Sequence, residues 1–314
     1  MGLTGAAFGL GFLFGPAISL FALEFSDSLA MPAFIAAAYS GLSILLTLFM
    51  FKETLPANKR NITKRGVLNL GTTALRMLRI PAVRLPLLLM FTQQLVFFAF
   101  ESLLGLFVLS RLGLLGQGTA LIFIYVGIIL IYVQVRIIGR WSKRFGDARM
   151  ATIAIGLLAV GLLLVALTPN QPHPLYFERR AAAELSQLAP SAVEVMVGNI
   201  GISLPDEARR GFGGILWFLA ALIPLSIGAG LIRPALNSLL VKRVPDQESG
   251  AVLGVSASFV SLADALAPLL GGLLFQSLGA SAPFTAGGVL LLGLFLISWK
   301  LGAQSRPSVA ASTS

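Results

Sequence analysis

The sequence predicts an all-α integral membrane protein with eight transmembrane helices. Hydrophobic residues make up 56% of the chain and charged residues only 11%. A soluble domain cannot bury so large a share of apolar side chains, and apolar runs of about 20 residues are long enough to cross a bilayer as helices. The chain has no cysteine, which excludes disulfides and thiolate metal sites.

Eight apolar stretches meet this length, and we expect each to form one membrane-spanning helix. They cover residues 3–23, 31–51, 86–109, 118–139, 150–168, 213–240, 252–276 and 283–301. The first stretch has no basic segment before it and is longer than the apolar core of a signal peptide. We therefore interpret it as a span that is retained in the mature protein.

The positive charge of the chain is concentrated in loops. The net charge of +10 comes from Lys and Arg in the segments that follow the second, fourth, sixth and eighth spans, whereas the opposite loops carry few cations. Because basic loops stay in the cytoplasm, both termini are expected there. This pattern predicts a multi-pass protein of the inner or plasma membrane, with the lipid bilayer and not nucleic acid as its partner.

Polarity also divides the chain into parts. Residues 52–85 form a polar, basic linker that is longer than the other cytoplasmic connections. It separates a pair of helices, residues 1–51, from a bundle of six, residues 86–302. The bundle contains an external loop at 169–212. The Ser- and Ala-rich tail, residues 303–314, is expected to be disordered.

A ladder of small residues ending in proline occurs twice. The first copy consists of Gly2, Gly11, Gly15 and Pro16, and the second of Gly254, Ala263, Ala267, Pro268, Gly271 and Gly272. An apolar span follows each copy at nearly the same distance. Because the second copy begins the last two of six spans, one half should contain six helices and two halves twelve. The first half therefore lacks four helices in this chain.

The ladder has a physical meaning of its own. Small residues at i and i+4 let helix backbones approach closely in lipid, and a proline at midspan kinks the helix. Two interpretations remain open: ordinary tight packing, or an element that bends or seals between rigid bundles.

These residues make the chain resemble the major facilitator superfamily of transporters, and within it the drug/proton antiporters. The antiporter motif of that family reads G-x8-G-x3-G-P-x2-G-G, and the first copy matches it except at Ser19 and Leu20. A second family signature corresponds to GRWSKRFGDAR, in which Lys143 replaces an acidic residue. The matching or adjacent loop residues are Gly139, Arg140, Arg144, Gly146 and Arg149. The resemblance implies a gating latch at this loop, although basic charge that merely sets the topology is the alternative.

Three ionisable residues are expected within spans, where charge is costly and often functional. They are Glu101, Asp264 and Arg233. Glu101 or Asp264 is a candidate to exchange a proton with a cavity, while Asp264 could instead form a fixed pair with Arg233. We favour the cavity for Glu101 and the pair for Asp264.

Uncharged polar and aromatic residues complete the candidates. Gln93, Gln94 and Asn237 are candidates for substrate contacts or interhelical hydrogen bonds. The third span is rich in phenylalanine, which fits either a pocket for an apolar or amphipathic substrate or a lipid-facing surface. The sequence shows no nucleotide-binding loop, hydrolase motif or metal-ligand cluster, so no enzymatic activity, metal or cofactor is expected.

The sequence thus predicts a secondary active transporter in an N-terminally truncated form, which exports small molecules in exchange for protons. A truncated gene, a start assigned too late or a second chain that supplies the missing helices would each account for the short first half. The alternative function is a non-transporting membrane scaffold or remnant derived from a transporter.

Overall fold

The structure is a computed structural model that describes residues 2–25, 30–52, 70–179, 181, 204–245 and 248–304. Its elements are α1 (Gly2–Phe25), α2 (Met31–Met50), α3 (Leu70–Arg79), α4 (Pro81–Leu112), α5 (Gly116–Tyr132), the π-helix η3 (Val133–Ile137), α6 (Ile138–Ala166), the 3-10 turn η4 (Glu207–Arg209), α9 (Gly213–Val241), α10 (Ser249–Leu278) and α11 (Ala282–Gln304). The described residues contain no strand. The predicted all-α class is confirmed.

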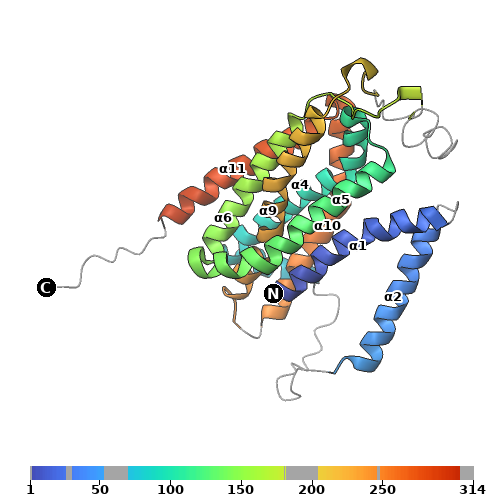
Figure 1. The fold of residues 1–314 in the computed structure, drawn as a ribbon. Coiled ribbons are helices and arrows are strands. Elements are labelled where there is room, and N and C mark those ends of the chain that lie inside the picture. The colour runs from blue at the N-terminus through green and yellow to red at the C-terminus, as the bar shows by residue number, and fades with distance from the viewer. Residues whose placement is uncertain are drawn as a thin grey trace.

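The predicted spans correspond to α1, α2, α4, α5, α6, α9, α10 and α11. Among the described residues, six helical stretches are long and apolar enough to cross a membrane, and Gly9–Ala22 is a shorter apolar stretch. One of the six, Gly116–Ala166, contains two predicted spans. The other helices form an elongated bundle, and α1 and α2 lie beside it (Figure 1).

The connection between the fourth and fifth predicted spans is almost entirely helical. Helical hydrogen bonding continues through η3 into α6, and the break falls at Gly146, with φ +74° and ψ 161°. Only glycine adopts this left-handed backbone without strain. A single glycine therefore reverses the chain where the sequence predicted an open loop.

The segment predicted as a linker contains helical structure. The expected polar segment 52–85 includes helix α3 and the first turn of α4, while residues 53–69 lie outside the described part of the chain. Helix α3 buries Met77 against the bundle. Next to Met77, Arg76 Nη2 lies 3.0 Å from Glu248 Oε1, at the start of α10. Helix α3 is thus attached to the bundle by an apolar and an ionic contact.

The bundle is packed around α6 and α4. Helix α6 packs against α9 and α11, and α4 packs against α10 (Figure 1). The closest approach joins α6 to α9: a Cβ at Gly161 would lie 2.5 Å from Leu225 N, and one at Gly228 would lie 2.6 Å from Ala154 O. These glycines let the two backbones touch, which is how helices associate tightly in lipid.

Helices α1 and α2 lie at the side of this bundle. Helix α1 packs against α5, whereas α2 contacts α1 and has no buried residue. Figure 1 shows the pair as an open hairpin. The expected disorder of the tail concerns residues that, from 305 onward, lie outside the described chain, as does 182–203 of the external loop.

Candidate functional site

A cavity of about 380 Å³ lies where α1 meets the six-helix bundle. Its described lining consists of Gly11, Phe12 and Pro16 from α1, Glu101 from α4 and Phe123 from α5. The rings of Phe12 and Phe123 meet edge to face, with centroids 5.5 Å apart. A cavity of this size holds a small organic molecule, and it offers aromatic faces and one carboxyl group.

The first glycine ladder contributes to the cavity, while neighbouring residues make the close contact with α5. A Cβ at Gly127 of α5 would lie 3.0 Å from Leu13 Cα, and one at Gly9 would lie 3.1 Å from Ile131 Cγ1. A Cβ at Gly11 or Gly15 would meet no described atom within 4 Å. The ladder and the packing surface therefore occupy different faces of α1. Gly2 begins α1.

In the second ladder, too, some residues pack against a neighbouring helix and others do not. Ala263 and Ala267 are fully buried in α10. A Cβ at Gly271 would lie 2.9 Å from Leu103 Cδ1, so this glycine permits the close packing of α10 on α4. A Cβ at Gly254 or Gly272 would meet no described atom within 4 Å, and Pro268 is exposed.

The intramembrane charges come together from three helices. Asp264 of α10 accepts a hydrogen bond of 3.3 Å from Gln94 Nε2 of α4. The Asp264 carboxylate also interacts electrostatically with Arg233 of α9 and with Glu101. The structure thus links the two carboxyl candidates to each other, and Gln94 is an interhelical hydrogen-bond donor. Of the other polar candidates, Gln93 is buried and Asn237 is half-buried.

The phenylalanines of the third predicted span are mainly packing residues. Phe97, Phe100 and Phe107 are buried, and the ring of Phe107 lies 4.5 Å from that of Phe284 in α11. The aromatic lining of the cavity comes instead from Phe12 and Phe123, which the sequence did not single out. Periodicity does not distinguish these positions because all faces of a membrane helix are apolar.

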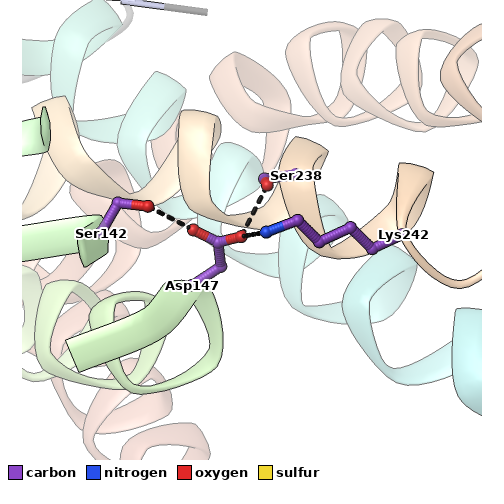
Figure 2. A network of polar contacts seen from close by, with 4 residues as sticks. All are labelled: Ser142, Asp147, Ser238 and Lys242. Atoms are coloured by element: carbon purple, nitrogen blue, oxygen red, sulfur yellow. Dashed lines mark hydrogen bonds and ion pairs between the residues drawn. The ribbon is translucent and has the colours of Figure 1, made fainter. Parts of the chain in front are cut away.

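At the basic end of the bundle, Asp147 of α6, directly after the break at Gly146, connects α6 to α9 (Figure 2). Ser142 Oγ donates to Asp147 Oδ1 at 2.8 Å, while Ser238 Oγ and Lys242 Nζ each donate to Oδ2 at 2.6 Å. Burial raises the pKa of Asp147, but the hydrogen bonds from Lys242 and the two serines, together with the Lys242 charge, outweigh it and hold the pKa below its usual value.

The residues of the GRWSKRFGDAR signature that the sequence analysis named lie near Asp147 but do not take part in its contacts with Ser238 and Lys242. Arg140, Arg144 and Arg149 are exposed, and the Arg144 guanidinium lies 5.4 Å from the centre of the Phe145 ring. A Cβ at Gly139 would meet no described atom within 4 Å, and Gly146 makes the turn. The sequence analysis missed Asp147, whose position next to Gly146 was the available signal.

At the opposite end, part of the external loop caps α4. Gly113 ends α4 with φ +66°, and the ring of the buried Tyr176 occupies the space where a Cβ would stand. The His173 backbone N–H donates to Leu112 O at 3.0 Å. Burial, followed by the charge of Arg210, lowers the pKa of His173, although a hydrogen bond to the Gly113 backbone opposes the shift.

The chain matches known proteins over nearly its whole length. A family model described as Major Facilitator Superfamily matches residues 1–180 and 195–313. Multidrug resistance protein 1 of Bacillus subtilis (strain 168) is 24% identical over 310 residues, which are 98% of this chain and 66% of that protein. Multidrug resistance protein 2 of the same organism is 24% identical over 306 residues, 96% of this chain and 64% of that protein.

A third relative is named for resistance to a single drug class. Tetracycline resistance protein, class B, of Escherichia coli is 23% identical over 296 residues, which are 93% of this chain and 60% of that protein. The chain thus spans somewhat less than two thirds of the length of these relatives. The family match covers most of its residues, and the chain belongs to the Major Facilitator Superfamily, a family of membrane transporters.

Proposed function

We propose that this protein takes part in proton-coupled export of small apolar or amphipathic molecules, and that Glu101 carries the exchanged proton. The observation that supports the proposal most directly is the position of Glu101 in a mainly apolar cavity between α1, α4 and α5. The names of the relatives, multidrug and tetracycline resistance proteins, favour small-molecule export.

The chemistry follows from the cost of charge in a membrane. An ionised carboxylate in an apolar cavity is unfavourable unless it binds a proton or meets a cation. Phe12 and Phe123 offer ring faces for an apolar substrate, and a positive group on the same molecule would lie against Glu101. Proton and substrate would therefore compete for one group, which is the simplest form of antiport.

Membrane orientation belongs to the same proposal. The basic end of the bundle, which carries Arg140, Arg144 and Lys242, would face the cytoplasm. The activity, substrates and partners are proposed for the whole transporter to which these helices correspond. Alternating access in such folds involves two bundles moving about a central site.

Glu101→Gln tests the proton role. Vesicles that contain the protein are loaded with ethidium or tetracycline, a pH gradient is imposed, and both dye movement and proton movement are followed. Because the amide cannot exchange a proton, Glu101→Gln is expected to abolish proton-driven transport, and Glu101→Asp to retain part of it. Glu178→Gln, which changes an exposed carboxylate outside the membrane helices, is the matched control.

Two other outcomes would contradict the proposal. Gradient-driven transport by Glu101→Gln at the rate of the unmodified protein would remove Glu101 from proton coupling. Failure of the unmodified protein to move either dye or to respond to the pH gradient would instead favour the non-transporting scaffold.

A further inference from the structure

Helix α3 presents two different faces. Ala74, Met77 and Leu78 pack against the core of the bundle. Leu75 and Arg79, which lie one turn apart, are exposed instead, and Leu75 exposes 61% of its surface. A helix that combines exposed leucine with arginine is typical of the interface between lipid and water.

The connection to α4 places this helix at the membrane surface. A single residue, Ile80, joins α3 to α4. The apolar stretch of α4 begins at residue 86, so Arg84 lies about 3 Å before it along the helix axis. The α3–α4 joint, residues 79–84, is therefore at the level of the phospholipid headgroups.

Three arginines meet at this joint. Arg79 ends α3, Arg84 belongs to the first turn of α4, and Arg243 follows the end of α9. The Arg243 Nη1 donates to Ala82 O at 2.5 Å, which holds the guanidinium of α9 against the joint. A guanidinium has five N–H donors, so Arg243 keeps further donors for the oxygens of a phosphate group.

The positive charge of the joint is not neutralised by the bundle. Two neighbouring cations have carboxylate partners: Arg76 pairs with Glu248 and Lys242 pairs with Asp147. The three arginines of the joint are exposed and form no ion pair within the part of the chain that the structure describes. Such cations attract an anion, and at this depth the anion that a membrane supplies is a phospholipid headgroup.

We propose that the α3–α4 joint is a binding site for the headgroup of an anionic phospholipid. The three arginines of the joint bind the phosphate, and Leu75 lies among the acyl chains. A zwitterionic lipid binds less well because its own ammonium group already offsets the phosphate charge. Since Arg76 attaches α3 to α10, the lipid stabilises the packing of α3 on the bundle. The site does not depend on the proposed transport activity.

A comparison of two lipids in the membrane tests the site. Because the chain contains no cysteine, Leu88→Cys provides a single thiol for a bimane label. Leu88 is exposed on α4, one turn beyond Arg84. The labelled full chain is reconstituted with brominated phosphatidylglycerol or brominated phosphatidylcholine, whose bromine atoms quench a nearby bimane. Mixtures with the unbrominated lipids give the affinity of this position for one lipid relative to the other.

One arginine near an anionic headgroup contributes a factor of about five to the affinity. The joint should therefore prefer phosphatidylglycerol to phosphatidylcholine by at least about tenfold, and Arg79→Gln or Arg84→Gln should each lower this preference about fivefold. Lys143→Gln is the matched control. It removes the same charge from an exposed position of α6, whereas α3 packs against α4 and α10, and it should leave the preference unchanged.

Amide hydrogen exchange provides a second readout that does not depend on the label. In the unmodified chain, exchange of Leu70–Arg79 should be slower in phosphatidylglycerol nanodiscs than in phosphatidylcholine nanodiscs, because the lipid binds the folded helix. Arg84→Gln should remove this difference without altering the sequence of α3. Exchange of Gly213–Val241 should be the same in both lipids and in the variant, which shows that the bundle is folded.

Three results would overturn the site. The first is equal quenching by the two lipids, together with α3 exchange that does not depend on the lipid. The second is an equal loss of preference with Lys143→Gln and Arg79→Gln, which would indicate diffuse surface charge. The third is displacement of phosphatidylglycerol by inorganic phosphate at constant ionic strength, which would assign the arginines to a soluble anion.

Discussion

The contact between Asp147 and Lys242 should give a measurable coupling free energy between α6, at its break at Gly146, and α9. The perturbation is a double-mutant cycle of Asp147→Asn and Lys242→Met. The acceptor is buried, since 5% of the Asp147 side chain is exposed, whereas 68% of the Lys242 side chain is exposed. In solvent exposure, the pair is therefore intermediate between a fully buried and a fully exposed ion pair.

The expected magnitude follows from these exposures. Breaking a buried ion pair costs about 3–5 kcal/mol, and an exposed pair is worth about 0.2–1 kcal/mol. Because solvent screens the lysine, we expect a coupling free energy of about 1–2 kcal/mol for the pair. Asp147→Asn alone should lower the free energy of unfolding by about 2 kcal/mol. The substitution removes the charge of an acceptor that also accepts hydrogen bonds from Ser142 and Ser238, so these bonds become weaker.

The pH dependence has a definite sign. The folded pKa of Asp147 lies below its ordinary value of about 3.9, so the stabilisation is complete above that pH and disappears as the pH falls through the folded pKa. The contact should therefore be constant between about pH 6 and pH 8 and weaken only in acid.

Equilibrium unfolding in mixed micelles, followed by circular dichroism, measures the four members of the cycle. Lys143→Met, a change of an exposed lysine in α6 shortly before the same break, is the matched control and should be nearly neutral. A coupling below about 0.5 kcal/mol, or a coupling that disappears between about pH 8 and pH 6, would refute the reasoning.

Two further predictions concern α1 and the external loop. Gly127→Ala should weaken the packing of α1 on α5 by about 1–3 kcal/mol, because the new methyl group would lie 3.0 Å from the α1 backbone. The same unfolding assay measures this loss. Gly139→Ala is the control, because a Cβ there would meet no described atom within 4 Å. The lowered pKa of His173 means that the folded loop resists protonation, so its stability should fall as the pH decreases through about 6.5. Hydrogen exchange of residues 169–177 should show this loss, and His173→Gln should remove it; exchange independent of pH after correction for its intrinsic rate would contradict it.

Much of the fold could be predicted from local composition. The expected limits 213–240 and 252–276 differ from α9 and α10 by three residues or fewer at each end. The helix in the linker was harder to predict: α3 contains two threonines and two arginines among its ten residues, so its mean hydropathy is low although Met77 is buried. A helix of this kind is identified by its periodicity and by its partner surfaces, and one of the two partners of α3, helix α10, is distant in sequence.

The candidate site was only partly predictable. Glu101 could be identified because a carboxyl group within a span is rare and costly. Phe12 and Phe123 could not, since they are two among many phenylalanines. Arg243 and Asp147 were missed for a related reason: their partners Ala82 and Lys242 lie 161 and 95 residues away in the chain.

The sequence by itself determined that this protein is a multi-helical membrane protein and which segments form its apolar spans, because hydropathy is a property of each segment alone. The tertiary structure decided which small residues touch another backbone, which phenylalanines line the cavity and which carbonyl Arg243 reaches. These depend on the rotation of each helix about its axis. In lipid the outward and inward faces are both apolar, so the sequence pattern carries little information about that rotation.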